Sequence, residues 1–125
     1  SPEQQTMARN TMSDIVAKHL PHTEAEIMFN EGYPPMAPTE GNAKLLAIYS
    51  QVSEDFGFGP VIAINPRNAG AADISFVADK VKMALDGIGL MGSGGHTVNE
   101  VGDLATLDAM TIRAAVTLYR LSRPD

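Results

Sequence analysis

The chain has 125 residues, enough for one ordinary domain. It carries 9 Lys and Arg against 15 Asp and Glu, and this net charge of −6 argues against a nucleic-acid backbone or an anionic membrane as the main partner. Cys is absent, which excludes disulfides, paired-thiol redox centres and thiolate zinc sites and leaves the compartment open. No apolar run approaches the roughly 20 residues that a membrane-spanning helix needs.

The first 30 residues predict a helix followed by a strand. Ser1 and Gln4 form a capping-box pattern around Pro2, and apolar side chains at helical spacing extend the expected helix over residues 1–20. Pro21 is expected to stop it. Residues 24–30 alternate apolar and polar side chains, which is typical of a half-buried strand.

A proline-rich connector follows this helix and strand. The segment from residue 31 to residue 42 reads EGYPPMAPTEGN, and its prolines forbid both a helix and a central strand. It should run extended and semi-rigid. We therefore predict a domain boundary here, with one unit over residues 1–32, a linker over 33–42 and a second unit over 43–125.

The second unit alternates helices with short apolar strands. A helix capped by Asn42 and ended by Gly57 and Gly59 is expected first, and its apolar stripe consists of Leu45, Tyr49, Val52 and Phe56. Further along the chain the pattern predicts strands at 61–64 and 81–85 and helices at 72–80 and 104–121. The last helix is expected to bury Leu107, Met110, Ala114, Leu118 and Leu121. This alternation indicates an α/β fold with partly parallel strands.

A glycine-rich loop that ends in a histidine is the most distinctive segment. Residues 92–100 read GSGGHTVNE, so the backbone before His96 is unusually free and can approach a ligand closely. Neutral imidazole is a common metal ligand and general base. Spacing alone favours the simpler interpretation, a loop histidine bonded to backbone. A catalytic zinc needs about three protein ligands, and Asp73, Glu100 and Asp103 suggest such a set only loosely.

Other candidate site residues have simple structural explanations. His19 and His22 flank Pro21, and a favourable charge at a helix C-terminus is preferred to a metal-binding pair. Arg67 could bind a substrate carboxylate through its planar guanidinium, although a surface arginine is the commoner case. The glycines match neither a phosphate-binding loop nor a dinucleotide fingerprint.

Taken in order along the chain, these segments resemble a family of zinc metallopeptidases. The family includes glutamate carboxypeptidases, aminoacylases, acetylornithine deacetylase and succinyl-diaminopimelate desuccinylase. The glycine loop with His96, and Glu100 four residues later, is similar to the motif near the C-terminal end of those enzymes. Residues 70–73 match a glycine-rich turn with an Asp at a helix start. Residues 31–39 resemble the exit from the inserted lid domain, and residues 1–30 its last helix and strand.

The resemblance implies an architecture and a reaction. The chain would be the C-terminal part of a zinc-peptidase-like catalytic α/β domain, preceded by a helix–strand remnant of the α+β lid domain. The full enzyme would hold two zinc ions with a bridging water and would cleave a peptide or an N-acyl amino acid. It would form a homodimer through the lid and use neither nucleic acid nor membrane.

The resemblance also assigns roles residue by residue. His96 would bind one zinc ion, and Glu100 would brace the histidine loop. Asn68, Ala69, Gly70 and Ala71 would line the site near the substrate. The remaining ligands and the general base would lie upstream of Ser1, so this chain alone is expected to be inactive.

One position departs from the glutamate-releasing members. Those enzymes carry an arginine at the lid exit that binds the substrate carboxylate, whereas this chain has Tyr33. Arg67 is a candidate replacement. Glutamate specificity is therefore not implied, while hydrolysis of an amide bond is little affected.

Two other classes of protein remain open. The chain could be a non-catalytic dimerisation or interaction module without an active site of its own. It could also be an α/β module that binds a small molecule at the glycine loop without a metal.

Overall fold

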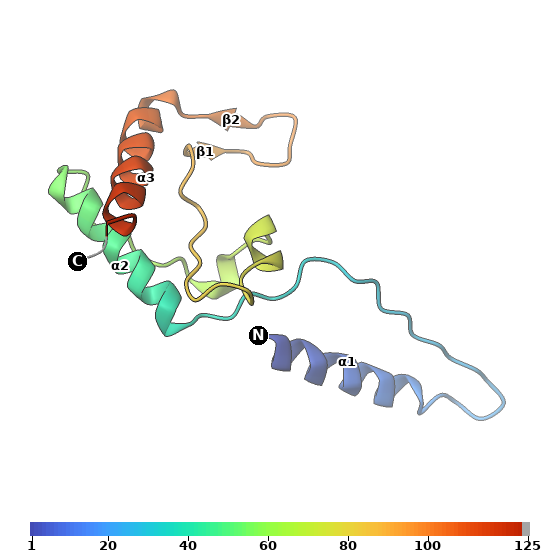
Figure 1. Ribbon diagram of the computed structural model, residues 1–125. Coiled ribbons are helices and arrows are strands. Elements are labelled where there is room, and N and C mark those ends of the chain that lie inside the picture. Colours follow the sequence, from blue (N-terminus) through green and yellow to red (C-terminus); the bar gives the residue numbers. More distant parts are fainter. Residues whose placement is uncertain (124–125) are drawn as a thin grey trace.

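The computed structural model describes residues 1–123 as a small mixed fold in which helices dominate. The α-helices span Pro2–Val16 (α1), Glu40–Asp55 (α2) and Leu107–Leu121 (α3), and the strands Gly92–Ser93 (β1) and Val101–Gly102 (β2) form one antiparallel pair. Short 3₁₀ turns span Pro66–Asn68 (η1), Asp73–Phe76 (η2) and Leu104–Thr106 (η3). In Figure 1, α2 and α3 lie side by side at one end, and α1 lies apart from them beyond a long connector.

The start of α1 confirms the sequence prediction, but its end does not. The Ser1 hydroxyl accepts a hydrogen bond from the backbone N–H of Gln4, and the Gln4 side chain bonds back to the Ser1 amine. The helix ends at Val16 and not at residue 20. Pro21 has no N–H to donate to the Ala17 carbonyl, which bars the α-helical ladder beyond residue 20, and the helix ends one turn before that limit.

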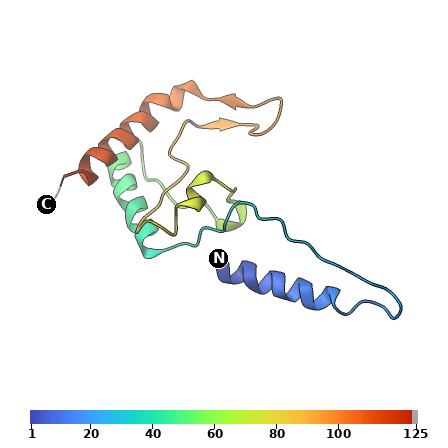
Figure 2. The ribbon, with the colours of Figure 1, turned by 45° about the vertical axis from the view of Figure 1, so that its right-hand side comes forward.

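The expected strand over residues 24–30 is absent, because no other segment among residues 1–123 forms a ladder with it. The segment instead returns alongside α1, held by side chains (Figure 2). The Arg9 guanidinium makes two bonds to the Glu31 carboxylate, at 2.5 and 3.2 Å, and lies 5.3 Å from the centre of the Phe29 ring. Helix α1 and residues 24–31 thus form an arm, and we keep this name for residues 1–31.

Helix α2 begins earlier than predicted because a different residue caps it. Thr39, and not Asn42, is the N-cap, and its side chain accepts from the backbone N–H of Asn42. The Asn42 side chain instead donates to the Ala37 carbonyl and accepts from the backbone N–H of Ala84, 42 residues away. It thereby ties the connector and a later loop to the first turn of α2.

The small core lies where α2 packs on α3. Its buried apolar side chains are Tyr49 and Val52 of α2, and a third buried apolar residue, Ala84, lies instead in the loop that bonds to Asn42 at the start of α2. Arg113 of α3 crosses the interface, where its Nε donates to Ser53 Oγ at 2.9 Å and its Nη2 to the Phe58 carbonyl at 3.3 Å. Polar contacts therefore join the two helices in addition to apolar burial.

The predicted apolar stripe of α2 is correct at its centre and wrong at its end. Tyr49 and Val52 are buried and Leu45 is half-buried, but Phe56 is 48% exposed. The helix ends at Asp55, and Gly57 follows with a φ of 76°, as expected for a residue that reverses the chain after a helix.

The buried face of α3 differs from the predicted one. Thr117 is buried and Met110 and Ala114 are half-buried, whereas the expected core residues Leu107, Leu118 and Leu121 are largely exposed. The apolar stripe on this helix is wide, and the side that meets α2 depends on a partner the sequence pattern does not specify.

The predicted α/β layering is not formed within residues 1–123. Residues 61–64 and 81–85, expected as strands, have no ladder partners, and the helix expected at 72–80 is reduced to η2 followed by turns. The one strand pair is antiparallel, and not partly parallel as predicted. A buried strand needs neighbours on both sides, and this part of the chain supplies none.

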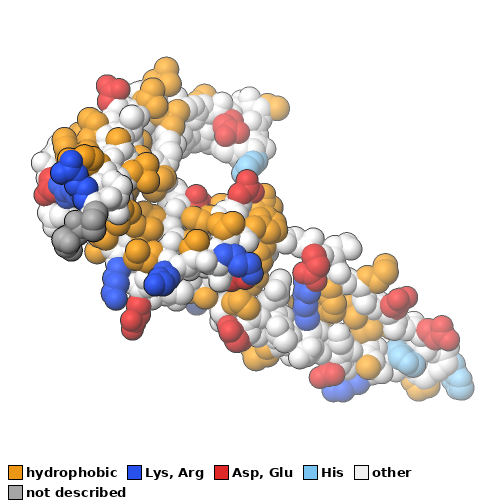
Figure 3. Space-filling view, viewed as in Figure 1, with side chains coloured by type: hydrophobic (Ala, Val, Ile, Leu, Met, Phe, Trp, Pro, Cys, Tyr) orange, Lys and Arg blue, Asp and Glu red, His pale blue; other side chains and the backbone are white. Residues whose placement is uncertain are grey.

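The molecule exposes far more surface than a compact protein of its size. Its accessible surface is 10,008 Å², whereas a compact monomer of this mass would expose about 6,500 Å². Figure 3 shows apolar side chains spread over the arm and the α2–α3 end, and a hollow below the hairpin. Within the described residues, none of the helices combines the length and the apolar character needed to cross a bilayer.

Candidate functional site

The glycine-rich segment folds into a tight β-hairpin. Strands β1 and β2 pair with Gly92 opposite Gly102 and Ser93 opposite Val101. A side chain at Gly92 would collide with the Val101 carbonyl, which explains why glycine is needed where the strands approach. At the base of the hairpin, the backbone N–H of Asp103 donates to the Met91 carbonyl at 2.7 Å.

The tip of the hairpin is closed by Thr97. Its hydroxyl donates to the Gly94 carbonyl at 2.7 Å and accepts from the backbone N–H of Asn99 at 3.1 Å. Gly94 has a φ of 68°, and a Cβ there would lie 2.7 Å from the Asn99 carbonyl oxygen. Glycine is therefore required at position 94 both by conformation and by space.

His96 lies at this tip in an unusual backbone conformation. Its φ is 63°, in the left-handed region that costs a non-glycine residue roughly 1–2 kcal/mol. Its backbone N–H donates to Glu100 Oε2 at 3.0 Å. The side chain is exposed, and no hydrogen bond of its ring to another described residue is found. The ring nitrogens are thus available to bind.

The second predicted group of site residues lies on a separate loop. The Asn65 side chain accepts from the backbone N–H of Arg67 at 3.0 Å and caps η1, after which Gly70 and Ala71 lead into η2. Arg67, Asn68, Ala69, Gly70 and Ala71 are all exposed. No hydrogen bond or ion pair between described residues joins this loop to the hairpin. The structure therefore shows no direct bond between these residues and His96.

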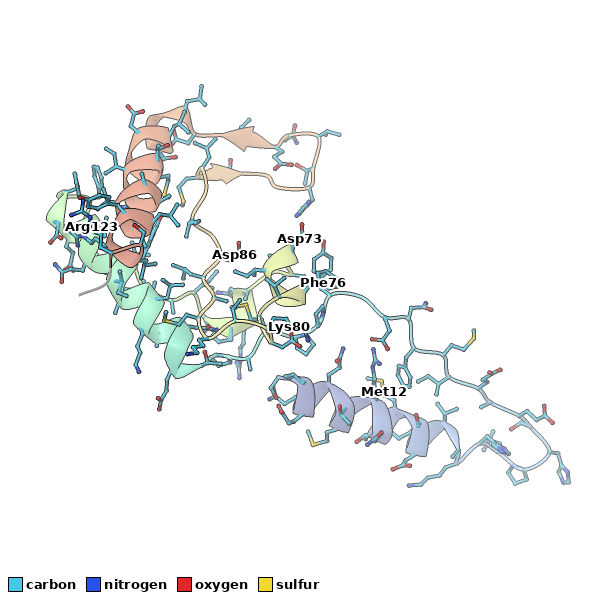
Figure 4. All side chains as sticks on the ribbon, viewed as in Figure 1. Met12, Asp73, Phe76, Lys80, Asp86 and Arg123 are labelled. Carbon is cyan, nitrogen blue, oxygen red and sulfur yellow. The ribbon has the colours of Figure 1, made fainter. Side chains whose placement is uncertain are left out.

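Tyr33 is turned toward η2. Its hydroxyl donates to Asp73 Oδ1 at 3.0 Å, and its ring lies 5.1 Å from that of Phe76, centre to centre. Figure 4 labels Asp73 and Phe76 on η2, where the connector passes. The hydrogen bond to Asp73 raises the pKa of Tyr33. Sequence reasoning missed this contact, because no local pattern signals a pair 40 positions apart.

The interpretation of His19 as a favourable charge at the end of a helix is wrong. Helix α1 ends at Val16 and has no basic residue in its last turn. His19 Nδ1 lies 3.1 Å from the Leu20 carbonyl oxygen, and His22 has a φ of 64°, so both belong to an exposed turn beyond the helix. This turn follows from the early stop at α1.

A zinc ion fits His96 as one ligand but not as a complete site. Its imidazole is exposed and forms no hydrogen bond with another described residue, so a ring nitrogen is free to bind a metal ion. The Glu100 carboxylate faces the main chain of His96. Over residues 1–123, no three His, Asp or Glu side chains come close enough together to hold a metal. The further ligands would have to come from other polypeptide.

No family model, curated protein or solved structure matches this chain.

Proposed function

We propose that this chain is the C-terminal portion of a zinc-dependent hydrolase that cleaves a peptide or an N-acyl amide bond, with His96 as a ligand of one of two zinc ions. The observation that carries the proposal is the hairpin: it is built around required glycines and presents a left-handed histidine with a free imidazole. Backbone strain of this kind is concentrated at functional sites.

The exposed area supports the view that the chain works as part of something larger. Its surface exceeds that of a compact monomer by about 3,500 Å². Obligate interfaces bury about 2,000–5,000 Å² of accessible surface counted over both partners. The extra accessible surface of this chain alone falls within that range. Part of this exposed surface belongs to apolar segments such as residues 61–64. Their composition predicts a strand, but they pair with no other described segment.

In the proposed hydrolysis, the zinc ions and the residues of this chain would have different roles. Bound zinc would supply a water of lowered pKa and would polarise the scissile carbonyl. The hairpin would hold the His96 imidazole toward the metal, and the loop that carries Arg67, Asn68, Gly70 and Ala71 would contact the substrate. The general base and the other ligands belong to the part of the enzyme that precedes this portion in the proposed arrangement.

The test compares two histidine variants of a longer protein that contains this chain. We expect zinc-dependent hydrolysis of N-acyl amino acids or peptides, and His96→Ala should lower it by more than about 100-fold, because even changes outside the ligand shell cost 10–100-fold. The matched control is His19→Ala, which alters an exposed turn on the arm. Full activity and unchanged zinc content in His96→Ala would rule the proposal out.

The same proposal predicts that the 125-residue chain alone has no zinc-dependent turnover, since it offers one ligand of the set. Turnover by the purified chain that is lost on chelation would contradict this division of the site.

A second candidate is a non-catalytic dimerisation or interaction module. The observation in its favour is the arm, whose apolar side chains are left largely in solvent: Met7 is 65% exposed, Ile15 64% and Met28 82%. A longer protein without hydrolase activity that dimerises through residues 1–31 would favour this candidate.

A further inference from the structure

The coil between η2 and the hairpin contains a dipeptide with a reactivity of its own. Asp86 precedes Gly87, and no other Asp or Asn of the chain is followed by glycine. Both residues are exposed and lie outside any helix or strand, and Figure 4 labels Asp86 on this coil. We propose that this dipeptide is a site of spontaneous covalent modification, at which Asp86 becomes an isoaspartyl residue through a cyclic imide.

The reaction needs only water, which it first releases and then takes up again. The main-chain nitrogen of Gly87 attacks Cγ of the protonated Asp86 carboxyl group, and a new C–N bond closes a five-membered imide. The carboxyl hydroxyl leaves as water with the proton of that nitrogen. Water then opens the ring at either carbonyl. Opening at Cγ restores aspartate, whereas opening at the original main-chain carbonyl leaves the chain running through Cγ, which is the isoaspartyl form.

Gly87 leaves the attacking nitrogen accessible. A Cβ placed at this residue would meet no atom within 4 Å, and glycine itself has no side chain to hinder the approach of Cγ. The Gly87 N–H donates to no other described residue, so the attack breaks no hydrogen bond. The φ of Gly87 is 73°, in the left-handed region that favours glycine. The fold therefore selects glycine at the position where glycine makes the preceding aspartate reactive.

The Asp86 carboxylate is also free to react. It forms no hydrogen bond or ion pair with another described residue. The other aspartates of residues 1–123 accept hydrogen bonds or lie within α-helices, and they are Asp14, Asp55, Asp73, Asp79, Asp103 and Asp108. Ring closure at those positions must first break such bonds, which opposes it. Asp86 thus combines an unbonded carboxylate with an unbonded nitrogen next to it.

The modification would change the path of the chain between two bonded points. On one side Ala84 is buried, and its N–H donates to Asn42 Oδ1 at 2.9 Å. On the other side the Met91 carbonyl accepts from the Asp103 N–H at the base of the hairpin. The isoaspartyl link adds one carbon to the main chain, about 1.5 Å of length. Because both ends of this stretch are bonded, the added length should loosen one of them. Any effect on hydrolysis rests on the proposed function.

The test is the ageing of the purified 125-residue chain in warm neutral buffer, without metal or substrate. Peptide mapping by mass spectrometry and enzymatic methylation of the free isoaspartyl carboxyl locate the product. We expect isoaspartate at Asp86 to accumulate at least about tenfold faster than at Asp14, an exposed aspartate inside α1. A tenfold ratio corresponds to a barrier lower by about 1.4 kcal/mol.

Three variants keep Gly87 and its left-handed conformation in place. Asp86→Glu preserves the charge but would have to close a larger ring, so isoaspartate at this peptide should disappear. Asp86→Asn should form the same isoaspartyl product faster, with release of ammonia in place of the first water, because a neutral amide needs no protonation before the attack. Asp14→Asn is the matched control, and it should stay unmodified because the main chain of α1 is hydrogen-bonded.

Equal accumulation at Asp86 and Asp14 would overturn the inference, and so would an undiminished product in Asp86→Glu. In the isolated isoaspartyl form, the Ala84 or the Asp103 amide should exchange at least about fivefold faster, the equivalent of losing one modest hydrogen bond. Unchanged exchange at both amides would refute the change in chain path. These readouts do not depend on zinc or turnover, whereas failure of the proposed hydrolase function would appear as full activity of His96→Ala in the longer protein.

Discussion

The Tyr33 hydroxyl donates to Asp73 Oδ1 at 3.0 Å and joins the proline-rich connector to the first residue of η2, 40 positions away. The Phe76 ring supports the same contact from the other end of that turn. Because the arm leads into the connector just before Tyr33, this contact fixes where the connector leaves the rest of the molecule.

Because of this contact, we expect Tyr33 to ionise at a higher pH than an ordinary tyrosine. The hydrogen bond to Asp73, and then the charge of that carboxylate, raise the pKa of Tyr33 above its ordinary value of 10.0. A raised pKa means that the contact is fully present below about pH 10 and is lost as the pH rises through the raised value. Burial also raises the pKa of Tyr49, so the two late tyrosines must be followed separately. A ¹³C NMR titration of the tyrosine rings should show a late signal that Tyr33→Phe removes and that Asp73→Asn moves to lower pH, while the Tyr49 signal stays in place. A profile identical in Asp73→Asn would contradict the contact.

The contact between Arg9 and Glu31 should weaken in acid. The Arg9 guanidinium, through its hydrogen bonds and then its charge, lowers the pKa of Glu31. The contact is therefore present above the ordinary glutamate value of 4.5 and is lost as the pH falls through the lowered one. A ¹³C NMR titration of the Glu31 carboxyl should report a lowered midpoint that rises in Arg9→Ala. Lys18→Ala, which removes an equal charge from the turn after α1, is the control and should leave the midpoint in place.

Truncating a buried apolar side chain should lower the free energy of unfolding far more than truncating an exposed one. Val52 is fully buried between α2 and α3, and Val52→Ala should lower the free energy of unfolding by about 2 kcal/mol through lost burial and the cavity left behind. Ile62 is 83% exposed, and Ile62→Ala should change it by less than about 0.5 kcal/mol. Urea unfolding of the 125-residue chain measures both.

The same Ile62→Ala change gives a different result if residues 61–64 pair as a strand in a longer protein. There it should cost more than about 1 kcal/mol, since the side chain would be buried. Equal, small effects in the short and the long protein would show that this segment remains at the surface in both.

The arm should associate with another chain. Its extended residues 24–30 have unpaired main-chain groups and Met28 is 82% exposed, and such edges recruit further strands. We expect light scattering to show concentration-dependent association at micromolar levels, weakened by Met28→Lys. Leu118→Lys places the same charge at an exposed apolar position on α3 and should leave association unchanged. A monomer at these concentrations, or equal effects of both variants, would argue against association through the arm.

Local chemistry was readable from the sequence wherever a few neighbouring residues decide the outcome. The capping box of Ser1 and Gln4, the glycine turn at Gly57 and the helical region that ends at Leu121 follow from contacts within one or two turns of chain. The glycine loop before His96 was also readable as a segment of unusual backbone freedom, because that freedom belongs to the residue type.

Tertiary structure decided everything that needs a distant partner. An apolar run such as residues 61–64 has the composition of a strand, but a strand exists only with a ladder, and residues 1–123 provide none for it. The face of α3 that became buried was chosen by α2 through Arg113 and Ser53, 60 positions apart. The sequence by itself determined local turns and caps, whose bonds close over short distances, while sheet formation and burial depended on long-range contacts that no local pattern encodes.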